Sequence, residues 1–253
     1  MEIADGVYSI RQTGRNAYPS GYSQAYLLDD REAGLTLIDT LADPDAHLVL
    51  GQLKRLGWPE KRLERILLTH GHRSHVGGLA TLKGLSGATV HSHIWEADII
   101  AGKRKAQPVS LRPIPPLRTY TQRLGLALGV GHPPCPVNEY LVDKQEVGPV
   151  RVVHTPGHTP GHVVFYWPER RALFTGDNIV TWPRLGAGWP SFQLDEMQFR
   201  DSLRYMEKSV GDIAEERLEP SDPPVEVIGV AHGEPITRGA AKRMRALIRN
   251  LDR

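Results

Sequence analysis

Four short apolar segments of this chain each lead directly to a histidine or an aspartate. His70 ends RILLTH, His158 lies just after VRVVHTP, Asp177 ends RALFTGD, and His232 ends VEVIGVAH. Short apolar runs bounded by turn residues are typical of buried strands. Because the loops that build binding sites converge at strand ends in layered α/β folds, we expect these four side chains to meet at one edge of the protein.

Strand-like and helix-like segments alternate through both halves of the chain. Further strand-like runs lie at residues 6–12, 24–30, 35–40, 88–93 and 162–167. Amphipathic helices are expected at residues 43–57, 94–102, 195–210 and 237–252. The first of these has Asp43 as its expected N-cap, Pro44 in its first turn and Gly57 at its end. Two similar halves of this kind predict a layered α/β fold, with a single domain over residues 1–253.

The composition excludes several classes of protein. No apolar run approaches the roughly 18 residues that cross a membrane, and the N-terminus has neither the basic start nor the apolar region of a signal peptide. A single cysteine, Cys135, excludes an internal disulfide framework, so we expect a cytoplasmic protein that does not bind a membrane. The net charge of +2 is too balanced to indicate nucleic acid. The basic residues of the expected last helix fit a solvated face better than an RNA-binding one.

The segment at about residues 103–147 differs from the rest and is interpreted as an insertion. Between Ile99 and Asn138 there is no aspartate or glutamate, but there are several lysines and arginines and seven prolines. Long segments with little regular structure are usually functional or mobile. A cationic lid here would attract an anionic substrate, whereas a solvated loop and a dimer contact are the alternatives. The oligomeric state is not predicted.

The histidines form a pattern that is typical of a metal site. His70, His72 and His75 lie within six consecutive positions, and three further strand-end residues accompany them, namely His158, Asp177 and His232. Neutral imidazole is a good ligand for zinc and for iron. His70 and His72 can face the same ion from one turn, while His75 can face a second ion, and the two oxygens of Asp177 could bridge both.

The motifs THGHRSH, TPGH, FTGD and VAHGEP resemble those of the metallo-β-lactamase superfamily, in particular its glyoxalase II, lactonase and persulfide dioxygenase branches. The resemblance implies a four-layer αββα sandwich with a metal site at one edge. It also implies that His70, His72 and His158 hold a first metal, and that His75 and His232 hold a second, bridged by Asp177. The expected cofactor is one or two zinc ions, with iron or manganese as alternatives.

Ser74 departs from the family pattern, in which this position is an aspartate that binds the second metal. A neutral hydroxyl is a poor ligand for a dication, so one negative charge is missing where two dications would repel each other. We therefore expect a weak second site and a complete first one. Glu96 or Glu234 could fold back to help.

The function expected from these features is metal-dependent hydrolysis of a small molecule, which the cationic insertion suggests is anionic. A metal-bound hydroxide would attack an ester, thioester, lactone or amide carbonyl, with Ser74 as a candidate catalytic residue that hydrogen-bonds the attacking water. The first alternative is a single-iron persulfide dioxygenase, which needs only the first site. The second alternative is a catalytically impaired binding protein.

Other polar residues near the motifs have less specific interpretations. His154 and His162 flank His158 at four-residue spacing, and we expect them to support the site or to pack in the core rather than to bind metal. Asp39, at another expected strand end, fits equally well as an outer partner of the site or as a turn residue. Cys135, which prolines surround, is expected to be structural.

Overall fold

The computed structural model describes residues 1–14, 22–31, 34–106, 123–124, 128, 131–210 and 224–251. Within these residues the strands form two sheets. The first sheet follows chain order: β1 (Glu2–Ala4), β2 (Val7–Thr13), β3 (Tyr22–Asp30), β4 (Gly34–Ile38), β5 (Leu63–Leu67), β6 (Thr89–His93) and β7 (Glu139–Leu141). The second sheet has the order β12 (Val227–Gly229), β11 (Ala172–Phe174), β10 (Val163–Trp167), β9 (Val150–His154) and β8 (Glu146–Val147).

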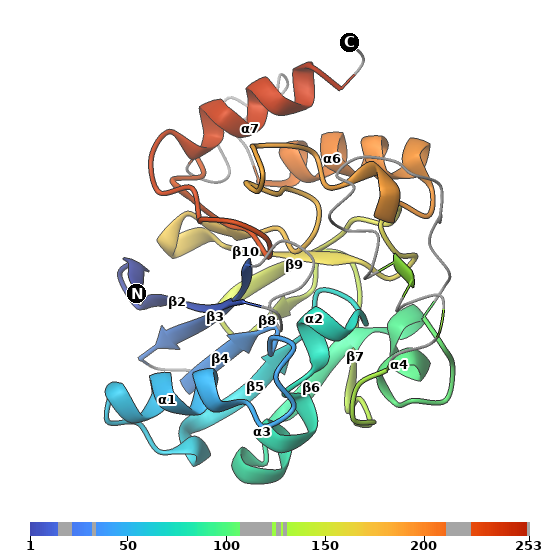
Figure 1. Cartoon of the computed structure of the whole chain (residues 1–253). Coiled ribbons are helices and arrows are strands. Elements are labelled where there is room, and N and C mark those ends of the chain that lie inside the picture. Colours follow the sequence, from blue (N-terminus) through green and yellow to red (C-terminus); the bar gives the residue numbers. More distant parts are fainter. Residues whose placement is uncertain are drawn as a thin grey trace.

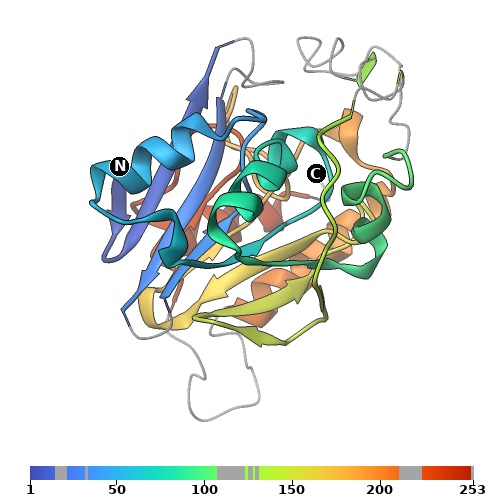
Figure 2. The ribbon, with the colours of Figure 1, turned by 90° about the horizontal axis from the view of Figure 1, so that it is seen from below.

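Helices cover the outer faces of both sheets (Figure 1). On the outer face of the first sheet lie α1 (His47–Arg55), α2 (Arg73–Val76), α3 (Leu79–Ser86) and α4 (Ile94–Ile100). On the outer face of the second sheet lie α6 (Glu196–Val210) and α7 (Ala240–Arg249). Three short 3₁₀ turns complete the described elements: η1 (Glu60–Arg62), η3 (Pro168–Arg170) and η4 (Pro190–Phe192). The layers therefore follow the order helix, sheet, sheet, helix in Figure 1, and Figure 2 looks from below onto the helices that cover the first sheet.

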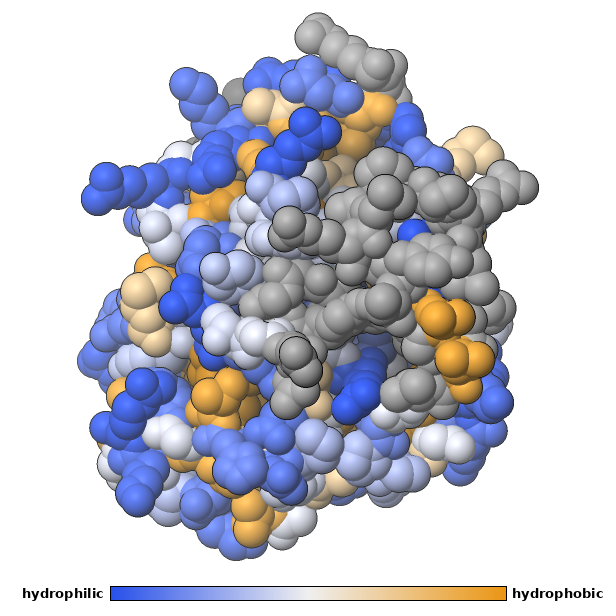
Figure 3. Space-filling view, in the orientation of Figure 1, coloured by the Kyte–Doolittle hydropathy of each residue, from blue (hydrophilic) through white to orange (hydrophobic). Residues whose placement is uncertain are grey.

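Three buried clusters join these layers. One lies between the sheets and contains Leu67, Phe165 and Trp167, while the other two join each sheet to its helices. Every residue of β10 is buried because this strand faces the other sheet on one side and helix α6 on the other. The sequence of such a strand is a continuous apolar run rather than an alternation of apolar and polar residues. The outer face of the molecule in Figure 3 is largely hydrophilic, with hydrophobic residues in small groups among the described parts.

The four-layer αββα fold expected from the sequence is confirmed, with corrections at two boundaries. Helix α1 begins at His47 rather than at Asp43, because the Asp43 carboxylate accepts hydrogen bonds from the backbone N–H groups of Asp45 and His47 and so caps a turn before the helix. Gly57 follows the helix in a left-handed conformation, as expected. In the part of the chain that is described, no helix is long and apolar enough to cross a membrane.

The range predicted for the insertion, about residues 103–147, includes residues at its C-terminal end that belong to the two sheets. Strand β7 and strand β8 both lie within that range, and β7 pairs in parallel with β6 as the last strand of the first sheet. The backbone N–H of Asn138 bonds the carbonyl of Val90, so the chain has already joined the sheet there. Most of residues 107–130 lie outside the described part, and the expected lid lies there with them. The lid and the single-domain organisation stay predictions.

Candidate metal centre

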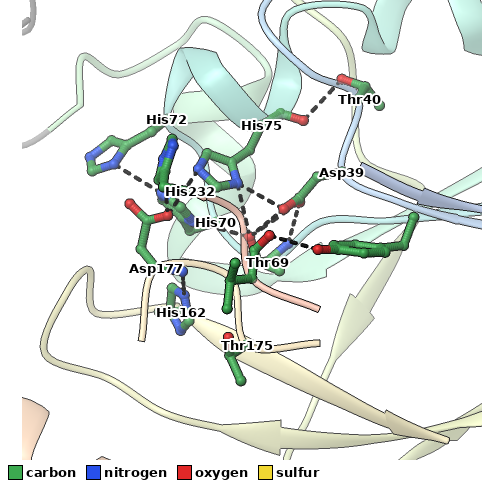
Figure 4. Close-up of polar contacts among 12 residues, drawn as sticks. Asp39, Thr40, Thr69, His70, His72, His75, His162, Thr175, Asp177 and His232 are labelled. Atoms are coloured by element: carbon green, nitrogen blue, oxygen red, sulfur yellow. Dashed lines mark hydrogen bonds and ion pairs between the residues drawn. The ribbon is translucent and has the colours of Figure 1, made fainter. Parts of the chain in front are cut away.

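The four strand-end residues do meet at one edge, and they come from both sheets. His70 follows β5 in the first sheet, while His158, Asp177 and His232 follow β9, β11 and β12 in the second. Two groups of metal-ligating atoms result, and Asp177 belongs to both of them (Figure 4). The ligand atoms within each group lie within 4.8 Å of one another.

The first group consists of three imidazoles and one carboxylate: His70, His72, His158 and Asp177. His70 Nε2 lies 2.9 Å from His72 Nδ1, and His158 Nε2 lies 3.2 Å and 3.1 Å from these two nitrogens. The Oδ2 atom of Asp177 lies 3.3 Å from His158 Nε2. Three nitrogens that bind one tetrahedral zinc ion lie about 3.3 Å apart, given Zn–N bonds of about 2.0–2.1 Å, so this spacing fits a zinc ion.

The imidazoles of the first group are held in the neutral form that binds metal. Burial lowers the pKa of His70 and of His158 well below its usual value, and neighbouring histidines add to the effect on His70. Burial likewise lowers the pKa of His72 to about 4. These side chains therefore offer lone pairs rather than protons at neutral pH.

The second group consists of His75, Asp177 and His232. The Nε2 atoms of both histidines lie 3.3 Å from Asp177 Oδ1. His75 Nδ1 lies 2.7 Å from Asp39 Oδ2, and His232 Nδ1 donates to the carbonyl oxygen of Tyr22 at 3.0 Å. Each ring is therefore fixed through Nδ1, which leaves Nε2 directed into the site, an arrangement typical of metal-binding histidines.

Asp39 is a partner of the site rather than only a turn residue, so one of its two expected roles is selected. Its carboxylate also accepts hydrogen bonds from the backbone N–H and the hydroxyl of Thr69, both at 2.9 Å. Although burial by itself lowers the pKa of His75, the charges of Asp39 and Asp177 raise it to about 10. The second group is therefore set in a strongly negative local field.

The buried carboxylate of Asp177 is held ionised by the histidines around it. Burial raises its pKa, but the nearby His232, His75 and His158 outweigh this and hold the pKa well below its usual range. His162 helps to fix the position of Asp177, since the backbone N–H of Asp177 donates a hydrogen bond to His162 Nε2 at 3.2 Å. His162 lies outside both groups, as expected, and His154 stacks on His93 instead.

Glu96 and Glu234 were candidates to replace the missing carboxylate, and neither does so. The two oxygens of Glu96 accept hydrogen bonds from the backbone N–H groups of Gly71 and Gly161 at 2.9 Å and 3.0 Å. Glu96 thus joins the turn that carries His70 and His72 to the loop that carries His158. Glu234 is exposed and pairs with Arg11 at 2.6 Å.

Two supporting roles were not foreseen from the sequence. The first is the link that Glu96 makes between the two loops of the first group. The sequence offered a signal for it, because Glu96 shares a helical face with the apolar residues Ile99 and Ile100 and is buried with them. The ring of Trp189 lies 4.7 Å from the His232 ring, and its indole N–H donates to the carbonyl of Trp182. The aromatic residues that follow the FTGD motif, Trp182, Trp189 and Phe192, were a sequence signal for this contact.

The residues present fit a metal ion, as their unsatisfied atoms show. Among the described residues, His75 Nε2 and Asp177 Oδ1 are buried and have no hydrogen-bond partner. Buried polar atoms are rarely left without a partner, and these two face each other across the second group. Ser74 lies in α2, between His72 and His75 in the sequence, and is 6% exposed.

Comparison with known proteins agrees with this fold and site. The chain belongs to the metallo-beta-lactamase superfamily, whose family model matches residues 18–232. It is 34% identical over 167 residues to a hydroxyacylglutathione hydrolase of Ruegeria pomeroyi, which covers 65% of this chain and 49% of that protein. A hydroxyacylglutathione hydrolase of Rhizobium meliloti is 32% identical over 64% of this chain and 48% of its own length. The chain spans about half the length of these relatives.

Solved structures share the fold over nearly the whole chain. The metallo-beta-lactamase family protein TTHA1429 from Thermus thermophilus has a TM-score of 0.66 at 24% identity, covering 99% of this chain and 81% of that one. TTHA1623 in a di-iron-bound form has a TM-score of 0.61 at 25% identity, covering 94% of this chain and 98% of that one. The family and the histidine–aspartate cluster together imply that this protein binds metal ions.

Proposed function

We propose that this protein is a metal-dependent hydrolase that cleaves thioesters of small hydroxy acids. The observation that carries the proposal is the pair of ligand groups that share Asp177 at one edge of the two sheets. The relatives named hydroxyacylglutathione hydrolase support thioesters over lactones, esters and amides. We propose zinc as the metal, because most of the donor atoms are imidazole nitrogens.

In this proposal each residue has a distinct task. His70, His72 and His158 would hold the first ion, and His75 and His232 would hold the second, with Asp177 between them. When bound, zinc lowers the pKa of a water molecule to near neutrality and polarises a carbonyl group. Ser74 would donate or accept a hydrogen bond at the attacking water, because its hydroxyl is buried in α2 between His72 and His75 in the sequence. Asp39 fixes the ring of His75, and Glu96 fixes the two loops of the first group.

The expected cytoplasmic location is part of the same proposal. Cys135 is a free, buried thiol, and burial raises its pKa, so it is a poor nucleophile. An inert single thiol agrees with a reducing compartment.

The test is to purify the protein, measure its metals by plasma mass spectrometry and assay hydrolysis of a lactoyl thioester by release of the free thiol. We expect zinc and thioester cleavage that a chelator removes and added zinc restores. No turnover of thioesters, esters or lactones with added zinc or manganese would instead identify a catalytically impaired binding protein.

A single-iron persulfide dioxygenase is the second candidate, because the first group offers three imidazoles and a carboxylate without any help from the second. One iron per chain, together with oxygen uptake on a glutathione persulfide, would favour this candidate. Zinc with thioester hydrolysis and no oxygen uptake would favour the hydrolase. The same purified sample serves both assays.

A further inference from the structure

A cavity lies against the turn that carries His70 and His72. Its volume is about 430 Å³, within the range of small-molecule sites. Gly71 forms part of its wall, and so does Ile99 near the end of α4. A Cβ atom added to Gly71 would lie 3.1 Å from Ile99 Cγ2, so the turn packs closely against this helix. Gly71 lies between the proposed ligands His70 and His72 in the sequence, so the cavity adjoins the turn that carries both of them.

The described residues that line this cavity include several cations and no acidic residue. The cations are Arg73, Lys103, Arg104 and Lys105. Arg104 is engaged, since its guanidinium donates to the carbonyl oxygen of Trp95. Among the described residues, Arg73, Lys103 and Lys105 form no hydrogen bond or ion pair through their side chains. Other surface cations of this protein pair with a carboxylate, as Arg11 does with Glu234 and Arg62 does with Asp29.

His132 closes another side of the cavity and is tied to the protein backbone. Its Nε2 atom donates to the carbonyl oxygen of Ile100 at 3.1 Å. Arg73 and His132 both line the cavity, and burial lowers the pKa of His132. The free cations therefore surround a hollow rather than projecting from a flat surface.

We propose that this cavity is the subsite for an anionic arm of the substrate, a carboxylate or a phosphate, carried on the thiol half of the thioester. The inference rests on the proposed hydrolase function and adds where the substrate charge is recognised. The Arg73 guanidinium can bind either group through two parallel hydrogen bonds, and Lys103 and Lys105 supply point charges. The arm would thus be held beside the metal turn, with the thioester carbonyl at the ligand groups.

The kinetic test compares three lactoyl thioesters: those of pantetheine, which is neutral, of phosphopantetheine and of mercaptoacetate. In the double variant Arg73→Gln/Lys103→Gln, we expect kcat/KM to fall about tenfold to hundredfold for the anionic substrates that the subsite accepts. The neutral thioester should keep its rate. Whether the phosphate or the carboxylate substrate is affected identifies the group that binds. The matched control is Lys242→Gln/Arg243→Gln, which removes two exposed cations from α7 on the far side of the second sheet.

A binding measurement separates this inference from the proposed function. The S-methyl thioethers of the same thiols cannot be hydrolysed, and their binding to the metal-loaded protein can be followed by calorimetry. We expect at least one anionic thioether to bind about tenfold more tightly than the neutral one, and this preference to vanish in Arg73→Gln/Lys103→Gln. Equal binding of neutral and anionic thioethers, or equal binding by wild type and variant, overturns the subsite. Absence of hydrolysis of every thioester, the neutral one included, overturns the proposed function instead.

Discussion

The two ligand groups share Asp177 but differ in the charges that surround their imidazoles. In the first group, burial keeps His70, His72 and His158 neutral, and their nitrogens already lie at the spacing of a tetrahedral ion. In the second group, Asp39 and Asp177 place negative charge beside His75, while Ser74 stands where the family pattern has a carboxylate. Three well-placed neutral imidazoles can therefore define a site for one ion, whereas a second dication nearby requires compensating negative charge.

The largest effect is expected from removing a ligand of the first group. The variant His158→Ala should lose tight metal binding, because two imidazoles and one carboxylate no longer enclose the ion. Metal content after dialysis measures this. His154→Ala is the control, since His154 lies four residues away and outside both groups. Full metal retention by His158→Ala would show that the first group is not the metal site.

Ser74→Asp tests the missing charge and should have the next largest effect. The added carboxylate would supply negative charge next to His75 in the sequence, so metal content should rise toward two ions per chain and thioester hydrolysis should increase. Ser74→Asn has nearly the same shape without the charge and should leave both quantities low. If Ser74→Asn also gains a second ion, the missing negative charge is not what weakens the second site.

Asp39→Asn should weaken the second group and leave the first one intact. The amide keeps the size of the side chain but loses the charge beside His75, and changes of this kind typically cost about tenfold to hundredfold in metal affinity. A zinc titration of the metal-free protein, resolved into its two steps, measures the effect. Asp29→Asn, which removes a carboxylate paired with Arg62, is the control. A loss confined to the first step would reverse the assignment of Asp39.

The smallest effect is expected from changing Glu96, whose carboxylate links the two loops of the first group. In Glu96→Gln one of the two hydrogen bonds to Gly71 or Gly161 loses its acceptor, which should lower the free energy of unfolding by about 1–3 kcal/mol. Urea unfolding measures it, and Glu226→Gln, whose carboxylate is exposed, should change stability by less than about 1 kcal/mol. Unchanged stability in Glu96→Gln would show that the hydrogen bonds of Glu96 do not stabilise the two loops.

The sequence by itself determined the layers and the candidate ligands of this protein. Apolar runs that end on His70, His158, Asp177 and His232 predict strands and their polar ends, because the period of a strand and the polarity of its loops are local properties. The fold class is therefore confirmed. The start of α1 was missed by a few residues, because the carboxylate of Asp43 serves a turn before the helix just as well as it would serve the helix itself.

Only the tertiary structure decided how these residues are connected to the rest of the molecule. Asp39 could be a turn residue or a partner of the site, and the packing of β4 beside β5 brings its carboxylate to Thr69 and His75. Glu96 could be a ligand or not, and the position of α4 commits both of its oxygens to backbone N–H groups. Hydrogen bonds between residues distant in sequence depend on relative positions in three dimensions, and no local pattern encodes those positions.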